Sequence, residues 1–157
     1  MRPAMLVLLT LLTIPALAAP AKPAPAATAP GFDGAMWIWA PTQGTPPAMT
    51  CFLRGGFALP DGARVKSAEV VLTADNLFAL HVNGKFVGQG SKEPDNWRSP
   101  VRFDVTALLH PGDNVVAVEA LNTQPGPAGL IMKLTAVLDD GKAVTFASNP
   151  DWLTTDK

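Results

Sequence analysis

Turn-forming residues divide this sequence into short apolar stretches, and this constrains its fold more than any other feature. The 157 residues include 16 prolines and 13 glycines, well above average usage. Because proline breaks a helix and glycine weakens one, no long helix is expected. Several stretches instead alternate apolar and polar residues and are rich in β-branched side chains, which is typical of strands. Nine strands are expected, at residues 36–40, 50–59, 65–74, 77–82, 85–87, 101–105, 115–121, 130–138 and 143–147.

Two short polar segments have the composition of hairpin turns. Asn83-Gly84 separates the stretches 77–82 and 85–87, and a type I′ turn requires positive φ at both central positions, which Asn and Gly tolerate best. The segment 139–142, Asp-Asp-Gly-Lys, marks a second hairpin. The helical candidate at 104–109 stops before Pro111, after about one turn. Short strands without a helix of more than two turns predict an all-β fold, an antiparallel β-sandwich.

The interior of such a sandwich requires apolar side chains from both sheets. The side chains expected to be largely buried are Trp37, Trp39, Phe57, Leu72, Phe78, Val118 and Leu134. The pair Gly55-Gly56 within 50–59 favours a β-bulge, because glycine is uncommon in a regular strand. Cys51 is the single cysteine and lies in a strand-like stretch, so we expect a small buried hydrophobe rather than a free thiol.

The first eighteen residues have the pattern of a secretory signal peptide. Arg2 precedes an apolar run at 4–14, and Ala16 and Ala18 supply the small residues at positions −3 and −1 of a cleavage site. A membrane anchor is the alternative, but spanning takes about 20 apolar residues and Pro15 interrupts this run. We expect cleavage after Ala18, a secreted or periplasmic protein, and no membrane contact thereafter. Residues 19–32 form a Pro/Ala-rich linker, and residues 33–157 the folded domain.

Charge and motif content exclude several classes of function. With 12 basic and 13 acidic residues, the formal net charge is −1, whereas nucleic-acid binding needs a clustered basic excess. One cysteine and two histidines leave little material for a zinc site. The sequence contains no HExxH, CxxC or GxSxG motif and no phosphate-binding glycine loop. We therefore expect a non-catalytic, monomeric protein that does not bind nucleic acid.

Polar residues follow two of the expected strands and are the candidate ligand-binding groups. Asp75 and Asn76 come after 65–74, and Asn122 comes after 115–121. The loop that follows, Pro125 to Gly129, offers backbone carbonyls. Loops at the ends of a sandwich commonly carry binding sites, and such oxygen donors suit Ca²⁺. The alternative is that these Asx residues simply form turns.

Trp97 is the second candidate, because it stands in the polar segment 91–100. An aromatic side chain in such a segment is either a platform on which a sugar stacks or a lid over the core. The sequence leaves both roles open.

A series of short motifs carries a family resemblance. The motifs are Met36-Trp37-Ile38-Trp39, Phe52-Leu53-Arg54, Thr73-Ala74-Asp75-Asn76, His81-Val82-Asn83-Gly84-Lys85, Trp97, Phe103-Asp104-Val105-Thr106, Asn114-Val115-Val116-Ala117-Val118, Ala128-Gly129-Leu130-Ile131 and Asp151-Trp152. In this order they resemble the galactose-binding-domain-like module found beside the catalytic domains of bacterial α-L-rhamnosidases. The resemblance runs from about residue 35 to 153 and implies a jelly-roll β-sandwich.

The resemblance also implies a function, because the family includes Ca²⁺-dependent modules that bind L-rhamnose. Carried over by motif, Asp75, Asn76 and Asn122 would hold the metal together with the carbonyl of Pro127, and Trp97 would pack on the sugar. We therefore expect a carbohydrate partner, L-rhamnose or a related sugar, in a module that accompanies a glycoside hydrolase. The alternative is a structural or protein-interaction domain of a larger exported protein, without a sugar site. The family's last strand usually continues beyond Lys157, which suggests a truncated domain.

Overall fold

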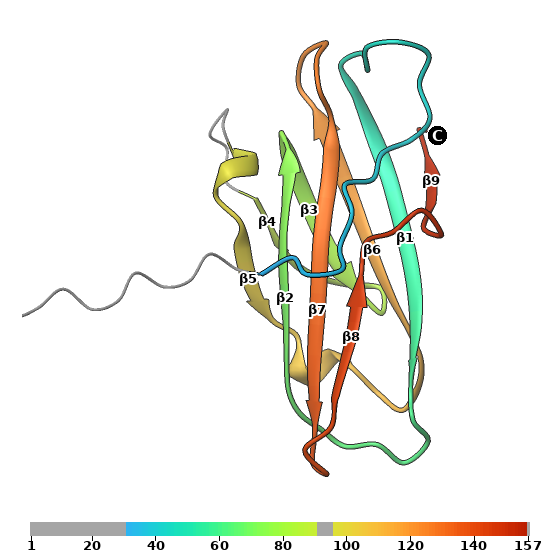
Figure 1. Ribbon diagram of the computed structural model, residues 1–157, viewed down its shortest axis with the longest axis vertical. Coiled ribbons are helices and arrows are strands. Elements are labelled where there is room, and N and C mark those ends of the chain that lie inside the picture. The colour runs from blue at the N-terminus through green and yellow to red at the C-terminus, as the bar shows by residue number, and fades with distance from the viewer. Residues whose placement is uncertain (1–30, 91–95, 157) are drawn as a thin grey trace, which may run out of the picture.

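The computed structural model describes residues 31–90 and 96–156, and these form two antiparallel β-sheets packed face to face (Figure 1). The expected signal peptide and nearly all of the linker lie outside the described residues. Among the described residues, no helix is long and apolar enough to cross a membrane. The elements are β1 (Met49–Leu59), β2 (Val65–Asp75), β3 (Leu77–Val82), β4 (Lys85–Gln89), η1 (Asn96–Arg98), β5 (Val101–Asp104), η2 (Thr106–Leu108), β6 (Gly112–Asn122), β7 (Gly129–Leu138), β8 (Ala143–Ala147) and β9 (Leu153–Thr155).

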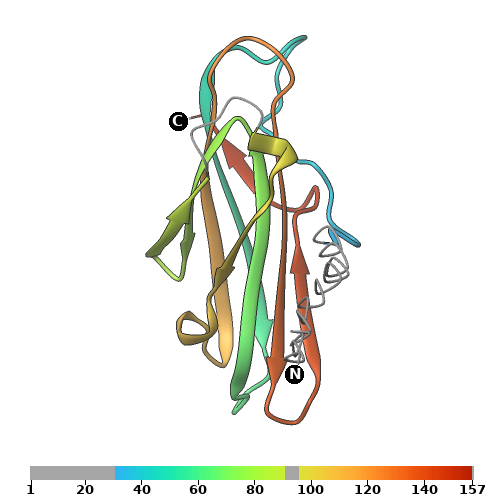
Figure 2. The ribbon, with the colours of Figure 1, turned by 90° about the vertical axis from the view of Figure 1, so that its left-hand side faces the viewer.

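The chain passes between the two sheets several times, and one of these crossovers is very short. One sheet has the strand order β4-β3-β6-β1-β9 and the other the order β5-β2-β7-β8. Strand β2 ends at Asp75 in the four-stranded sheet and β3 begins at Leu77 in the five-stranded sheet, so Asn76 is the single residue that connects these two strands across the layers. Figure 2 shows β2 and β3 in the separate layers of the sandwich. This crossover fixes Asp75 and Asn76 at the end of the sandwich where β7 begins.

The core lies between the inner faces of the two sheets, because side chains alternate between buried and exposed along the strands. Four of the side chains expected in it are buried, namely Leu72, Phe78, Val118 and Leu134. Trp39 and Phe57 are half-buried and pack against the core. The prediction for Trp37 is wrong, since 50% of this residue is exposed.

The N-terminal tryptophan segment explains that difference. The prediction of a strand at 36–40 is wrong, because the segment makes only a single bridge, between Ile38 and Leu130. It runs past the beginning of β7 outside both sheets, which leaves Trp37 at the surface. The short strand β9, which the sequence did not suggest, pairs with β1 instead. The other expected strands are present.

The predicted turns are confirmed by the backbone. Asn83 and Gly84 have φ of 49° and 77°, as a type I′ turn requires. Gly141 has φ of 84° in the β7–β8 turn, where the Leu138 N–H donates to the Lys142 carbonyl at 2.8 Å. The helical candidate is the single 3₁₀ turn η2.

The expected bulge at Gly55-Gly56 is wrong, because β1 pairs with β6 without a register shift over its whole length. Gly55 is buried on the inner face of β1, where it makes room for two aromatic rings. A Cβ atom there would lie 2.5 Å from the Trp152 ring and 2.6 Å from the Phe146 ring. These two rings stack with centroids 5.4 Å apart. Glycine at this position therefore leaves room for an aromatic stack that closes the sandwich.

Candidate functional site

A depression opens at the end of the sandwich where β2 ends and β7 begins. Its volume is about 280 Å³, and its lining residues are Trp37, Asp75, Trp97, Pro127, Ala128 and Gly129. Asp75 and Gly129 pair with each other at the end of the β2–β7 ladder, so this ladder places the Asp75 carboxylate beside the loop that precedes β7. Trp97 comes from η1, on the connection that leads into β5. Of the predicted site residues, the structure thus brings Asp75, Trp97 and Pro127 to one depression.

Asn76 lies beside this depression and joins the two strands around it. Its side-chain amide N–H donates to Asp75 Oδ1 at 2.7 Å. Its Oδ1 atom accepts from the backbone N–H and the hydroxyl of Thr123, at 3.0 and 2.9 Å. Its backbone N–H donates to the Leu121 carbonyl at 3.0 Å. Asn76 therefore orients the Asp75 carboxylate and anchors it to the end of β6.

Asn122 is at the same end of the sandwich but does not line the depression. Only 1% of the residue is exposed, and its side-chain amide donates to the Pro47 carbonyl at 2.8 Å. This bond ties the loop before β1 to the end of β6. Asn122 therefore supports the site from behind.

Trp97 is exposed beside Asp75 and is not a lid over the core, because 39% of the residue is accessible. The Arg98 guanidinium lies 4.6 Å from the centroid of the indole. Such a cation–π contact at an exposed site is worth about 0.5–1 kcal/mol and helps to hold the ring in place. The structure therefore provides an accessible aromatic side chain in the same depression as a carboxylate.

The oxygen atoms at this end of the sandwich are chemically suited to Ca²⁺. Asp75, which has a carboxylate, and Pro127, which has a backbone carbonyl, are both lining residues of the depression. Ca²⁺ takes six to eight such oxygens. Among the described residues, no group of three or more His, Cys, Asp or Glu side chains could hold a metal. A Ca²⁺ ion here would have to complete its coordination with water or ligand hydroxyls. Asn76 would have to exchange its Thr123 hydrogen bonds to contribute its oxygen.

Trp37 is a residue of this depression that the sequence did not suggest, and it lies against Gly129, the last residue of the candidate loop 125–129. A Cβ atom at position 129 would lie 2.7 Å from Cε3 of Trp37, so the glycine lets the indole lie directly against the start of β7. Glycine within a strand often marks a place where another group approaches closely. That signal was present, but the partner that needs the space is far away in the sequence.

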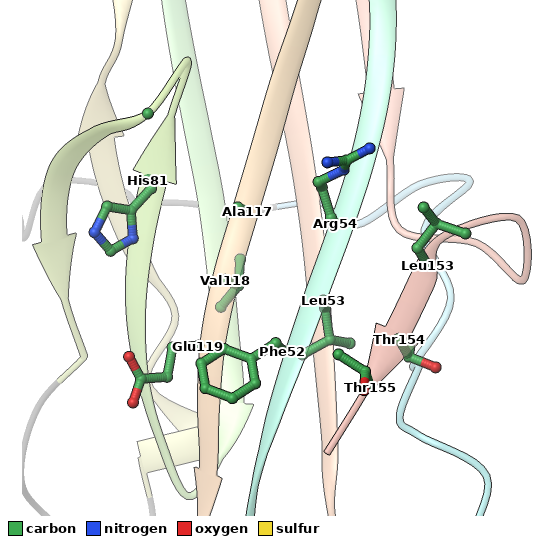
Figure 3. A pocket seen from close by; sticks show the side chains of 11 residues that line it. Phe52, Leu53, Arg54, His81, Ala117, Val118, Glu119, Leu153, Thr154 and Thr155 are labelled. Carbon is green, nitrogen blue, oxygen red and sulfur yellow. The ribbon is translucent and has the colours of Figure 1, made fainter. Parts of the chain in front are cut away.

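A second depression lies on the outer face of the five-stranded sheet and has a volume of about 600 Å³ (Figure 3). Phe52, His81 and Leu153 line it, with Arg54 and Glu119 among them. Figure 3 shows Glu119, which is paired with Phe52, set apart from Arg54, so the two charged groups do not face each other. This larger hollow is therefore a weaker candidate for a small-molecule site than the depression at Asp75.

Cys51 is fully buried on the inner face of β1. Burial raises the pKa of its thiol above the ordinary value. A nucleophilic cysteine needs the opposite, a lowered pKa and an accessible sulfur. This confirms that Cys51 is a buried hydrophobe.

Comparison with known proteins places this geometry in context. No protein-family model matches the chain. An α-L-rhamnosidase of Streptomyces avermitilis is 39% identical over 134 residues, which cover 82% of this chain and 13% of that enzyme. The crystal structure of a Streptomyces avermitilis α-L-rhamnosidase complexed with L-rhamnose aligns with a TM-score of 0.74 and 34% identity, over 82% of this chain and 13% of that one.

A lectin also has a similar fold. The lectin from Pleurotus ostreatus in complex with GalNAc aligns with a TM-score of 0.70 and 27% identity, over 81% of this chain and 36% of that one. The chain spans only a small part of the length of both relatives. It is a homologue of one region of the Streptomyces α-L-rhamnosidase, with the β-sandwich fold that rhamnosidases and this lectin share.

Proposed function

We propose that this protein is a secreted, non-catalytic carbohydrate-binding module that recognises L-rhamnose or a related sugar through Ca²⁺. The observation that carries the proposal is the common depression of Asp75, Trp97 and Pro127. Asp75, Pro127 and Asn76 would hold the metal, and Trp97 would contact the sugar. Asn122 would hold the loop before β1 in place through Pro47.

Sugar binding at a shallow site requires more than neutral hydrogen bonds. A sugar hydroxyl bonds to water about as well as to a protein, so the net gain of each exchange is only about 0.5–1.5 kcal/mol. A metal with open coordination positions changes this balance, because two neighbouring hydroxyls can replace its bound waters together. The Trp97 indole would then cover the apolar face of the sugar ring.

The comparisons support a carbohydrate partner in general. One similar structure is a rhamnosidase complexed with L-rhamnose and another is a lectin in complex with GalNAc. Because the chain corresponds to 13% of the rhamnosidase, the hydrolytic activity of that enzyme is not transferred to it. We propose that the module acts as a monomer and accompanies a glycoside hydrolase.

The test is calorimetric titration of the protein with L-rhamnose, in Ca²⁺ and in EDTA. We expect binding in Ca²⁺ alone. Asp75→Ala should abolish it, and so should Asp75→Asn, which keeps an oxygen acceptor for Asn76 but removes the charge. Trp97→Ala should weaken binding by about 1–3 kcal/mol, the scale of one aromatic contact.

Asp113→Ala is the matched control, because Asp113 is an exposed aspartate at the opposite end of β6. It should bind as the wild type does. Affinity that survives both EDTA and Asp75→Ala would contradict the proposed site.

A second candidate function is an accessory domain of a larger exported protein, without a sugar site. The outer face of the five-stranded sheet favours it, since Phe52, Phe86, Leu121 and Leu153 are between 36% and 65% exposed there. A neighbouring folded domain with an apolar surface would cover this face, and the rhamnosidase relative is long enough to supply one. A folded protein that binds no glycan in the same titration would support this alternative.

A further inference from the structure

Trp37 combines an exposed ring with a firmly held backbone. The Met36 N–H donates to the Ser148 carbonyl at 2.8 Å, and the Ser148 hydroxyl donates to the Met36 carbonyl at 2.7 Å. On the other side, Ile38 and Leu130 exchange two backbone hydrogen bonds of 2.9 Å. Trp37 is thus fixed at both neighbours, yet half of the residue is exposed. A rigid and exposed indole offers contact area at a low entropic cost of binding.

The position of this indole follows from Gly129. Cε3 of Trp37 occupies space that a side chain at position 129 would need, with 2.7 Å between it and an added Cβ. Gly129 is the residue paired with Asp75 across the β2–β7 ladder. The ladder and the missing side chain together place the Trp37 indole beside the Asp75 carboxylate.

The depression has one charged wall, and its other side chains are apolar. Asp75 carries the only formal charge among its six lining residues, and two of the others are tryptophans. A matching ligand has hydroxyls along one edge and an apolar edge elsewhere. The volume of about 280 Å³ is at the small end of ligand sites, which suits one terminal sugar residue rather than a polysaccharide chain.

We propose that Trp37 is a specificity-determining residue of this site. It selects sugars that place hydroxyls toward Asp75 and have an apolar group on the opposite edge. This inference rests on the proposed sugar-binding function. In a 6-deoxyhexose a methyl group would lie against the Trp37 indole. In the corresponding hexose a hydroxymethyl group would take its place, and its hydroxyl would lose water without gaining a partner.

The experiment compares L-rhamnose with L-mannose, which differ only by a hydroxyl on C6. We expect the wild-type protein in Ca²⁺ to prefer L-rhamnose by about tenfold, the usual scale for one small group in an apolar pocket. Trp37→Ala should bring the two dissociation constants to within about twofold. Trp97→Ala should weaken both sugars by a similar factor and keep their ratio. Phe86→Ala is the control, because Phe86 is an exposed aromatic residue outside the depression.

Gly129→Ala provides a second variant that keeps the indole but displaces it, and it should also lower the ratio. Circular dichroism and thermal melting would verify that each variant is folded. A wild-type ratio near one, or a ratio unchanged in both Trp37→Ala and Gly129→Ala, would overturn this inference while leaving Ca²⁺-dependent binding intact. A wild-type protein that binds neither sugar would overturn the proposed function and this inference with it.

Discussion

Asn83 has two roles, one of its backbone and one of its side chain. Its positive φ forms the turn between β3 and β4. Its Oδ1 accepts from the Val115 N–H at 2.8 Å, and its amide donates to the Leu108 carbonyl at 2.8 Å and to Asn114 Oδ1 at 2.9 Å. Asn114 is fully buried and donates to the His110 carbonyl at 2.7 Å. These bonds give a buried polar group its partners, as burial requires.

The Cys51 thiol gives a prediction at the same scale. Burial raises the pKa of this thiol in the folded protein, so the folded state favours its protonated form. The stability that the buried neutral thiol contributes is complete below the unfolded pKa of about 8.5 and is lost as pH rises through the folded pKa. Native protein should therefore react very slowly with a thiol reagent such as DTNB at pH 8, and fast in denaturant. Rapid reaction of the native protein would contradict the burial of Cys51. The free energy of unfolding should fall between pH 8 and pH 10, and less so in Cys51→Ala.

At the scale of elements, β1 shows how one residue sets the approach of the two sheets. The stack of Phe57, Phe146 and Trp152 joins β1 and β8 to the turn before β9, with ring centroids 4.9 and 5.4 Å apart. Gly55 lies directly beneath two of these rings. The following residue, Gly56, faces outward, where an added Cβ would meet only the Asn114 carbonyl at 3.6 Å.

This contrast predicts different effects for the same substitution at adjacent positions. Gly55→Ala should lower the free energy of unfolding by about 1–3 kcal/mol, the usual cost of overpacking a core. Gly56→Ala should be neutral or raise it by up to about 1 kcal/mol, because alanine fits an exposed strand better than glycine. Urea unfolding of both variants measures the difference. Equal changes in the free energy of unfolding would contradict this prediction, because they would mean that the rings of Phe146 and Trp152 can move aside without destabilising the fold.

At the scale of the whole molecule, exposed large apolar side chains gather in two places. Met36, Trp37 and Trp97 lie at or near the end of the sandwich that carries Asp75. Phe52, Phe86, Leu121 and Leu153 lie on the five-stranded sheet. One molecule thus presents a small amphipathic depression and a broad apolar face, which correspond to the two candidate functions.

Export is a prediction that concerns the whole chain. The Ala16-Leu17-Ala18 sequence should direct cleavage after Ala18, so that the mature protein begins at Ala19. Intact mass and N-terminal sequencing of protein collected from the periplasm or the medium would measure this. Exported protein that still carries Met1 would contradict it.

Much of the fold could be predicted because its signals are local. Alternation with a period of two identifies a strand from its own residues, and Asn83-Gly84 specifies a turn through the φ angles that these residues tolerate. The failures at 36–40 and at β9 share a cause. Whether a short extended segment joins a sheet depends on the edge that is free beside it. Strand β9 finds the edge of β1, whereas the segment 36–40 meets β7 only at Leu130, beyond the end of the β7–β8 ladder at Lys133.

The sequence by itself determined that the chain forms strands and tight turns, and it placed Asp75, Asn76 and Trp97 at or beyond strand ends. Only the tertiary structure decided that Asp75, Trp97 and Pro127 share a depression, that Asn122 is buried behind it, and that Trp37 stands within it. The reason is that pairing between β2 and β7 joins residues more than fifty positions apart in the sequence. Alternation and turn chemistry act between near neighbours, whereas the register of distant strands is set by the packing of the complete core.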